Sequence, residues 1–117
     1  MLKKVFSFQL VVFAIAFLVI VFAKSDLYAA DCDVASVEKV GPYYGKVVVT
    51  LMNKTSSSVG GTWAPNTTRQ FYLDNSILNQ GLATLLTAYS MNKTVWARIE
   101  STTAQANSLI TIIYINK

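Results

Sequence analysis

The sequence predicts a small, mainly β domain in which five strands form a barrel and one α-helix lies between the third and fourth strands. Five segments are rich in β-branched and aromatic residues, and turn-forming residues separate most of them. One further segment, residues 76–91, repeats leucine at helical spacing. The order of three strands, one helix and two strands is the main evidence for the barrel.

The first thirty residues have the order of charge and hydropathy that is typical of a secretory signal peptide. Two lysines near the amino terminus precede an apolar run, residues 9–23, which holds one polar residue. A short polar stretch, residues 24–26, then leads into Leu27-Tyr28-Ala29-Ala30, which ends in two small residues. We predict cleavage after Ala30, which makes the protein secreted or periplasmic. Residues 31–117 then form one domain, the OB-fold-like domain of five strands and one helix.

An uncleaved membrane anchor is the alternative, because the apolar stretch of residues 5–23 is close to the ~20 residues that cross a bilayer. The chain would then be a membrane-anchored or envelope-associated structural domain that holds a partner protein. Lipidation is not expected, since Asp31 rather than a small residue precedes Cys32. The intact mass of the exported protein distinguishes the cleaved form from the anchored form.

The part of the chain after Ala30 is weakly charged and lacks the means to form an internal disulfide. It carries seven basic and five acidic side chains, with no basic block, so we expect no nucleic-acid partner.

Cys32 is the only cysteine of the chain. We expect the Cys32 thiol to be exposed to solvent and to have no function. The alternative is that it links two chains or reacts with a partner. Domains this small are marginally stable alone, which favours self-association.

The first two strands are predicted over residues 34–40 and 46–52. The second strand alternates cleanly, with Val47, Val49 and Leu51 on one face. A glycine- and proline-containing turn over residues 41–45 joins the two strands into a hairpin.

Residues 53–68 are predicted to form a long polar loop, and residues 69–73 a short third strand. Serine, glycine and asparagine dominate the loop, which also contains Trp63. A long loop on a small domain is often the place where a ligand binds.

The helix of residues 76–91 follows candidate N-cap residues and ends at Asn92, which favours a left-handed stop. A strip of small residues lies beside its leucine face, where a second backbone can approach closely: Gly81, Thr84 and Ala88. The strip is predicted either to pack on the sheet of its own domain or to contact another subunit.

The last two strands are predicted over residues 94–100 and 109–116. Trp96 lies on the first of them, either facing outward into a neighbouring subunit or buried under the helix. The resulting order of five strands and one helix is that of the OB-fold.

The chain also resembles small secreted bacterial proteins similar to the pentameric B subunits of subtilase and pertussis-like toxins. The resemblance lies in residues 37–41 running into 47–50, in residues 82–89 and in residues 92–96. It implies an OB-fold, a homo-oligomer of five subunits, carbohydrate binding and an enzymatic partner chain. Those subunits usually carry an internal disulfide, which this chain cannot form.

The sequence does not predict an enzyme. Histidine, the commonest general base and metal ligand, is absent from the chain. The acidic residues are scattered, and no glycine-rich phosphate loop follows a strand. We therefore expect no catalytic residues, no metal and no cofactor.

Candidate ligand-binding residues are aromatics in turns and the polar side chains beside them. An aromatic face stacks on the C–H groups of a sugar, while amides, hydroxyls or a guanidinium hold its hydroxyls or a carboxylate. The residues with this chemistry are Tyr43, Tyr44, Trp63, Asn66, Thr67 and Arg69. Two alternatives remain: Trp63 folds back to cap the core, and the tyrosines are ordinary exposed turn residues.

Overall fold

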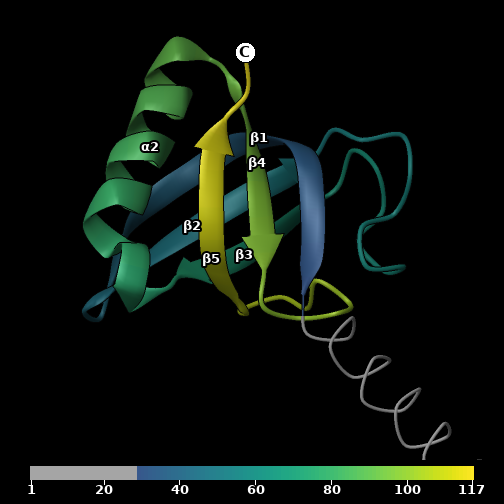
Figure 1. Ribbon diagram of the computed structural model, residues 1–117, viewed down its shortest axis with the longest axis horizontal. Coiled ribbons are helices and arrows are strands. Elements are labelled where there is room, and N and C mark those ends of the chain that lie inside the picture. The colour runs from purple at the N-terminus through teal and green to yellow at the C-terminus, as the bar shows by residue number, and fades with distance from the viewer. Residues whose placement is uncertain (1–28) are drawn as a thin grey trace, which may run out of the picture.

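The computed structural model describes residues 29–117, so nearly all of the predicted signal peptide lies outside the described residues. Seven elements follow one another along the chain (Figure 1): β1 (Ala30–Tyr43), β2 (Lys46–Asn53), β3 (Thr68–Leu73), a 3₁₀ turn η1 (Asn75–Ile77), α2 (Leu78–Met91), β4 (Thr94–Ile99) and β5 (Leu109–Ile115). Among the described residues no helix is long and apolar enough to span a bilayer.

The five strands close into a barrel in the order β1-β2-β3-β5-β4 (Figure 1). Neighbouring strands are antiparallel except β3 and β5, which run parallel where Tyr72 lies opposite Leu109. This order, with one helix between β3 and β4, is that of the OB-fold. The predicted fold class is therefore confirmed.

β1 begins four residues earlier than the sequence predicts, because its first part pairs with β4 and its second part with β2. Ala30 lies opposite Ile99, and Cys32 lies opposite Ala97. Register irregularities follow Cys32 and Val37, and the long strand bends there to reach both neighbours. Pairing with β4 is a long-range contact, so the local sequence pattern did not reveal it.

Alternate side chains of every strand fill the barrel. The fully buried positions include Leu51 of β2, Phe71 of β3, Val95 of β4 and Ile110 of β5. α2 covers one side of this core with Leu85 and other buried residues. The loop between β2 and β3 lies on the opposite side of the molecule from α2 (Figure 1).

The helix agrees with the prediction at its end and differs at its start. Asn92 adopts a left-handed φ of 53° after Met91, as predicted. The first predicted turn is instead the 3₁₀ turn η1, and no side chain caps a backbone N–H there. The Asp74 carboxylate accepts a hydrogen bond from the Ser76 hydroxyl at 2.5 Å. It does not accept one from a backbone N–H of the helix, so Asp74 is not a side-chain cap.

Candidate functional site

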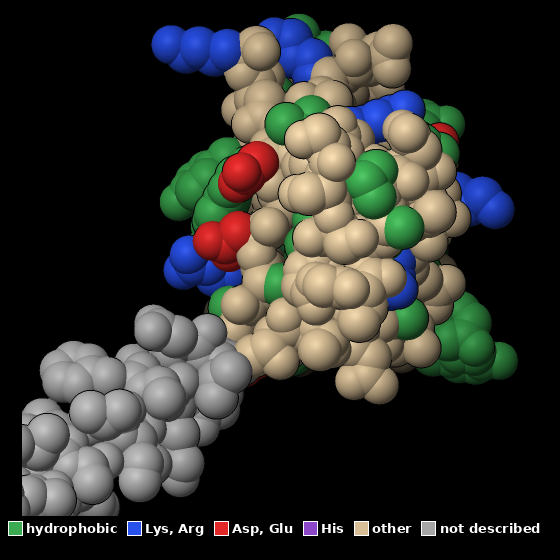
Figure 2. All heavy atoms as spheres, turned by 90° about the vertical axis from the view of Figure 1, so that its right-hand side faces the viewer, with side chains coloured by type: hydrophobic (Ala, Val, Ile, Leu, Met, Phe, Trp, Pro, Cys, Tyr) green, Lys and Arg blue, Asp and Glu red, His purple; other side chains and the backbone are tan. Residues whose placement is uncertain are grey.

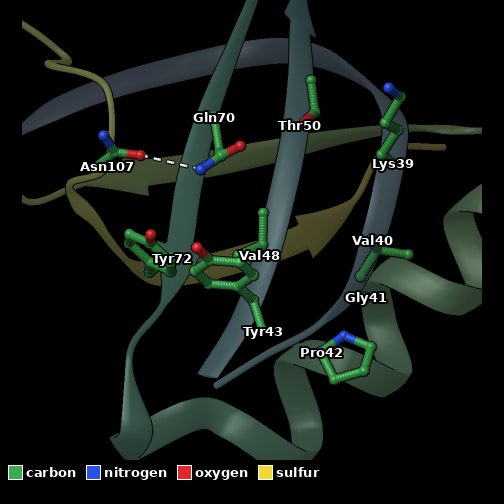
Figure 3. Close-up of a pocket in the computed structure, with 10 residues that line it drawn as sticks. All are labelled: Lys39, Val40, Gly41, Pro42, Tyr43, Val48, Thr50, Gln70, Tyr72 and Asn107. Carbon is green, nitrogen blue, oxygen red and sulfur yellow. Dashed lines mark hydrogen bonds between the residues drawn. The ribbon is translucent and has the colours of Figure 1, made fainter. Parts of the chain in front are cut away.

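A groove of about 550 Å³ lies on the outer face of β1, β2 and β3 (Figure 3). Its side chains come from these three strands and from Asn107 in the loop between β4 and β5. In an OB-fold, the face of strands 2 and 3 with the adjoining β1–β2 and β4–β5 loops is the usual ligand-binding surface. The groove therefore occupies the position where this fold binds ligands.

A row of polar side chains crosses one half of the groove. Lys39 lies opposite Thr50, and Thr50 lies opposite Gln70. Residues directly opposite each other in a sheet project from the same face, so the three side chains stand side by side. The Gln70 Nε2 donates a hydrogen bond to the Asn107 Oδ1 at 3.1 Å, which extends the row to the β4–β5 loop (Figure 3).

The other half of the groove is apolar and aromatic. Gly41 lies opposite Val48, and Val48 lies opposite Tyr72. Tyr43 and Tyr72 both line this part of the groove (Figure 3). In the described part of the chain no heavy atom other than those of its chain neighbours lies within 4 Å of the place where a Gly41 Cβ would stand, so this glycine keeps the floor of the groove open.

The charge of the groove is positive. Lys39 lines it, and the Lys46 Nζ lies 5.1 Å from the centroid of the Tyr72 ring. The described residues that line the groove include no aspartate or glutamate. An anionic group entering the groove thus meets lysine side chains without a competing carboxylate.

The tip of the β1–β2 hairpin places two aromatic rings at the rim of the groove. Tyr44 and Gly45 form the two-residue turn with φ of 46° and 76°, the signs that a type I′ turn requires. The rings of Tyr43 and Tyr44 meet edge to face at 4.7 Å. Tyr44 is 89% exposed. The structure therefore places Tyr43 in the groove and Tyr44 next to it.

Trp63 is not a ligand platform, which corrects its assignment as a candidate ligand-binding residue. The residue is fully buried, its ring packs edge to face on Phe71 at 5.2 Å, and its Nε1 donates to the Thr67 carbonyl at 2.9 Å. The alternative, in which Trp63 caps the core, is confirmed. Figure 2 shows the side of the molecule that carries the β2–β3 loop, which presents mostly uncharged polar side chains and backbone.

The other loop candidates lie outside the groove. Asn66 has a left-handed φ of 60°, and the Thr67 hydroxyl donates to the Ala64 carbonyl within the same turn. The Arg69 guanidinium is occupied by Thr62, Thr103 and Ala104 through hydrogen bonds of 2.9 to 3.5 Å. The structure thus places Arg69 outside the groove, with both of its terminal nitrogens bonded to other parts of the chain.

Of the residues that line the groove, the sequence predicted only Tyr43 as a candidate. The polar and aromatic residues that sequence reasoning missed are Lys39, Thr50, Gln70, Tyr72 and Asn107. The alternation of β2 and β3 does indicate that Thr50, Gln70 and Tyr72 share the outer face. The placement of Lys39 depends on the irregularity of β1, and that of Asn107 on a loop from a distant part of the chain. No local pattern marks these two positions.

The predicted subunit-contact residues divide between core and surface. Gly81 and Ala88 are buried, and a Cβ on Gly81 would stand 2.9 Å from the Leu73 side chain. These two residues serve packing within the domain, so their assignment as subunit contacts is wrong. Thr84 is half-buried, and its hydroxyl donates to the Gln80 carbonyl one turn earlier in α2.

Trp96 lies on the outer face of β4 rather than under the helix. Its ring stacks on Tyr114 at 5.8 Å, and its Nε1 donates to the Asp33 carboxylate at 3.0 Å. Next to it, Arg98 forms a two-point ion pair with Asp31 at 2.8 and 3.0 Å. Hydrogen bonding to Arg98 lowers the pKa of the Asp31 carboxyl. We call Trp96, Arg98 and Tyr114 the β4–β5 outer face.

Cys32 is buried in the core, which corrects the prediction of an exposed thiol. Desolvation raises the pKa of the thiol to about 11. The neutral thiol therefore dominates at neutral pH, and a thiol in this state is a poor nucleophile. Within residues 29–117 no group of three histidine, cysteine or acidic side chains is placed to hold a metal ion.

Comparisons of the chain with family models, with curated proteins and with solved structures gave no match. The resemblance to toxin B subunits therefore remains a prediction from the sequence pattern.

Proposed function

We propose that the chain is an exported, non-catalytic OB-fold domain that binds a saccharide in the β1–β2–β3 groove. The observation that carries the proposal is the pairing of a polar row, from Lys39 to Asn107, with an apolar half that contains Tyr43 and Tyr72. Export rests on the signal-like order of the first thirty residues.

The two halves of the groove suit the two sides of a sugar ring. Aromatic rings offer large apolar faces to C–H groups, while amide and hydroxyl groups form directional hydrogen bonds that fix orientation. Gln70 and Asn107 share one hydrogen bond and keep further donors and acceptors free for a ligand. Lys39 and Lys46 favour a sugar that bears a carboxylate, and such binding weakens as the salt concentration rises.

The proposal is tested by a substitution at Gly41 that places a side chain inside the groove. Gly41→Leu adds a side chain where the described residues leave open space, so we expect a folded protein whose groove is blocked. A glycan array containing neutral and acidic oligosaccharides identifies the ligand, and titration calorimetry then compares the variants. We expect binding by the wild type and a loss of at least about tenfold in affinity for Gly41→Leu, equivalent to about 1.4 kcal/mol.

Ala83→Leu is the matched control, because it places the same side chain on an exposed position of α2. It should bind as the wild type does. Retention of full affinity by Gly41→Leu would exclude the groove, and a wild-type protein that binds no saccharide on the array would exclude the ligand class. The alternative of an anchored domain that holds a partner protein would then remain.

We further propose that the domain forms a homo-oligomer and that the β4–β5 outer face contributes to the contact between copies. Trp, Tyr and Arg are the residue types that contribute most to protein interfaces, and Trp96, Tyr114 and Arg98 gather here. A ring of five subunits and an enzymatic partner chain follow from the resemblance alone.

A further inference from the structure

We infer that Arg69 is a positioning residue for the groove, because it fixes the β4–β5 loop so that Asn107 completes the polar row. The inference rests on the proposed function, since it concerns the same groove. It assigns a role in binding to a side chain that does not line the groove.

Arg69 lies at one end of the barrel, on the face of β3 opposite to the groove. It pairs with Leu51, whose side chain is fully buried, whereas the next residue, Gln70, projects outward into the groove. Successive residues of a strand point to opposite faces. One strand thus presents a loop-binding side chain and a ligand-binding side chain at adjacent positions.

The Arg69 guanidinium joins two loops that are distant in the sequence. Its Nη1 donates to the Thr62 Oγ1 at 3.0 Å and to the Ala104 carbonyl at 2.9 Å, and its Nη2 donates to the Thr62 carbonyl at 3.2 Å. Thr62 belongs to the β2–β3 loop and Ala104 to the β4–β5 loop. The planar fork of arginine suits this multiple donation, which a lysine ammonium cannot reproduce.

The two loops also approach each other closely at the backbone. A Cβ on Gly60 would stand 2.5 Å from the carbonyl carbon of Thr103, and Gly60 has a φ of 61°. The Thr62 hydroxyl donates to the Thr103 carbonyl at 2.6 Å. The β2–β3 loop is therefore a support that holds the β4–β5 loop in place.

The supported segment of the β4–β5 loop ends at the groove. Arg69 binds Ala104, and three residues later the Asn107 N–H donates to the Gln70 carbonyl at 2.7 Å. The Asn107 side chain then accepts from Gln70 in the polar row. Because the segment between Ala104 and Asn107 is short, loss of the first attachment loosens the second.

Arg69→Ala and Arg69→Lys test this inference on the full exported domain. We expect both variants to lose about tenfold in affinity for the saccharide identified on the array, the scale of a charge-assisted hydrogen bond. Lys93→Ala is the control, because it removes an exposed cation between α2 and β4 that does not line the groove. It should keep wild-type affinity.

A double-mutant cycle separates positioning from a general loss of stability. If Arg69 acts through Asn107, then Arg69→Ala should cost no further affinity in the Asn107→Ala background. Additive losses would overturn the inference. Should Arg69→Ala fail to fold, Thr62→Val replaces it, since this variant removes the hydroxyl that accepts from Arg69 and donates to Thr103.

Hydrogen exchange of the Asn107 backbone amide tests the inference without any ligand. We expect faster exchange in Arg69→Ala and unchanged exchange in Lys93→Ala, because only the first frees the loop. Unchanged exchange in both would overturn the positioning role. A wild-type protein that binds no saccharide would remove the proposed function, and the exchange result would still decide whether Arg69 holds the loop.

Discussion

At the scale of single residues, Tyr44 combines an unfavourable backbone conformation with nearly complete exposure. Its φ is 46°, and a left-handed conformation costs most L-residues about 1–2 kcal/mol. Asparagine followed by glycine is the preferred pair in a type I′ turn, yet here tyrosine precedes Gly45. Such local strain is often retained where a side chain has a function.

We predict that Tyr44→Asn makes the protein more stable and weakens the proposed binding of a saccharide. The free energy of unfolding should rise by about 1 kcal/mol, because asparagine tolerates the left-handed conformation. Thermal or denaturant unfolding measures the first effect, and titration calorimetry the second. Tyr44→Phe serves as control, since it keeps the ring and should keep the affinity. Unchanged affinity in Tyr44→Asn would show that the ring does not touch the ligand.

At the scale of elements, the carboxyl end of α2 depends on one left-handed residue. The Asn92 N–H bonds to carbonyls of the last helical turn, and the chain reverses there into β4. Glycine and asparagine are the residues that end helices in this way. The start of α2 has no comparable signal, since the 3₁₀ turn η1 replaces the predicted first turn.

We predict that Asn92→Gly leaves the stability unchanged or slightly higher, whereas Asn92→Val lowers the free energy of unfolding by about 1–2 kcal/mol. The cause is the φ of 53°, which a β-branched side chain adopts only with strain. Urea unfolding monitored by circular dichroism measures both variants. Equal stability of the valine and glycine variants would mean that the helix end relaxes to another conformation.

At the scale of the whole molecule, the exposed Tyr114 ring of the β4–β5 outer face predicts self-association. Tyr114 is 62% exposed and stacks on Trp96, beyond the core of its own barrel. We expect light scattering at tens of micromolar to give the mass of an oligomer. Tyr114→Lys should shift the mass toward the monomer, because a charged ammonium replaces an apolar ring at the contact.

Tyr89→Lys is the control for this experiment, since Tyr89 is similarly exposed but lies on α2. It should leave the mass unchanged. A strictly monomeric wild-type protein would contradict self-association, and an oligomer that persists in Tyr114→Lys would place the contact elsewhere.

The sequence by itself determined the order of the five strands and the one α-helix, because these depend on periodicity and on local turn chemistry. The alternation of β2, the leucine spacing of α2 and the left-handed Asn92 are local features of this kind. Part of the groove was also predictable, since Tyr43 lies in it and the outer face of β2 and β3 follows from alternation.

Tertiary structure alone decided the early start of β1, the burial of Cys32 and Trp63, and the role of Arg69. Each depends on partners far away in the chain: β4 for Cys32, Phe71 and the core for Trp63, and Ala104 for Arg69. Closing the barrel brings these partners together. A local sequence pattern records which side chains are apolar or polar, but contacts between distant segments decide which of them remain free to bind a ligand.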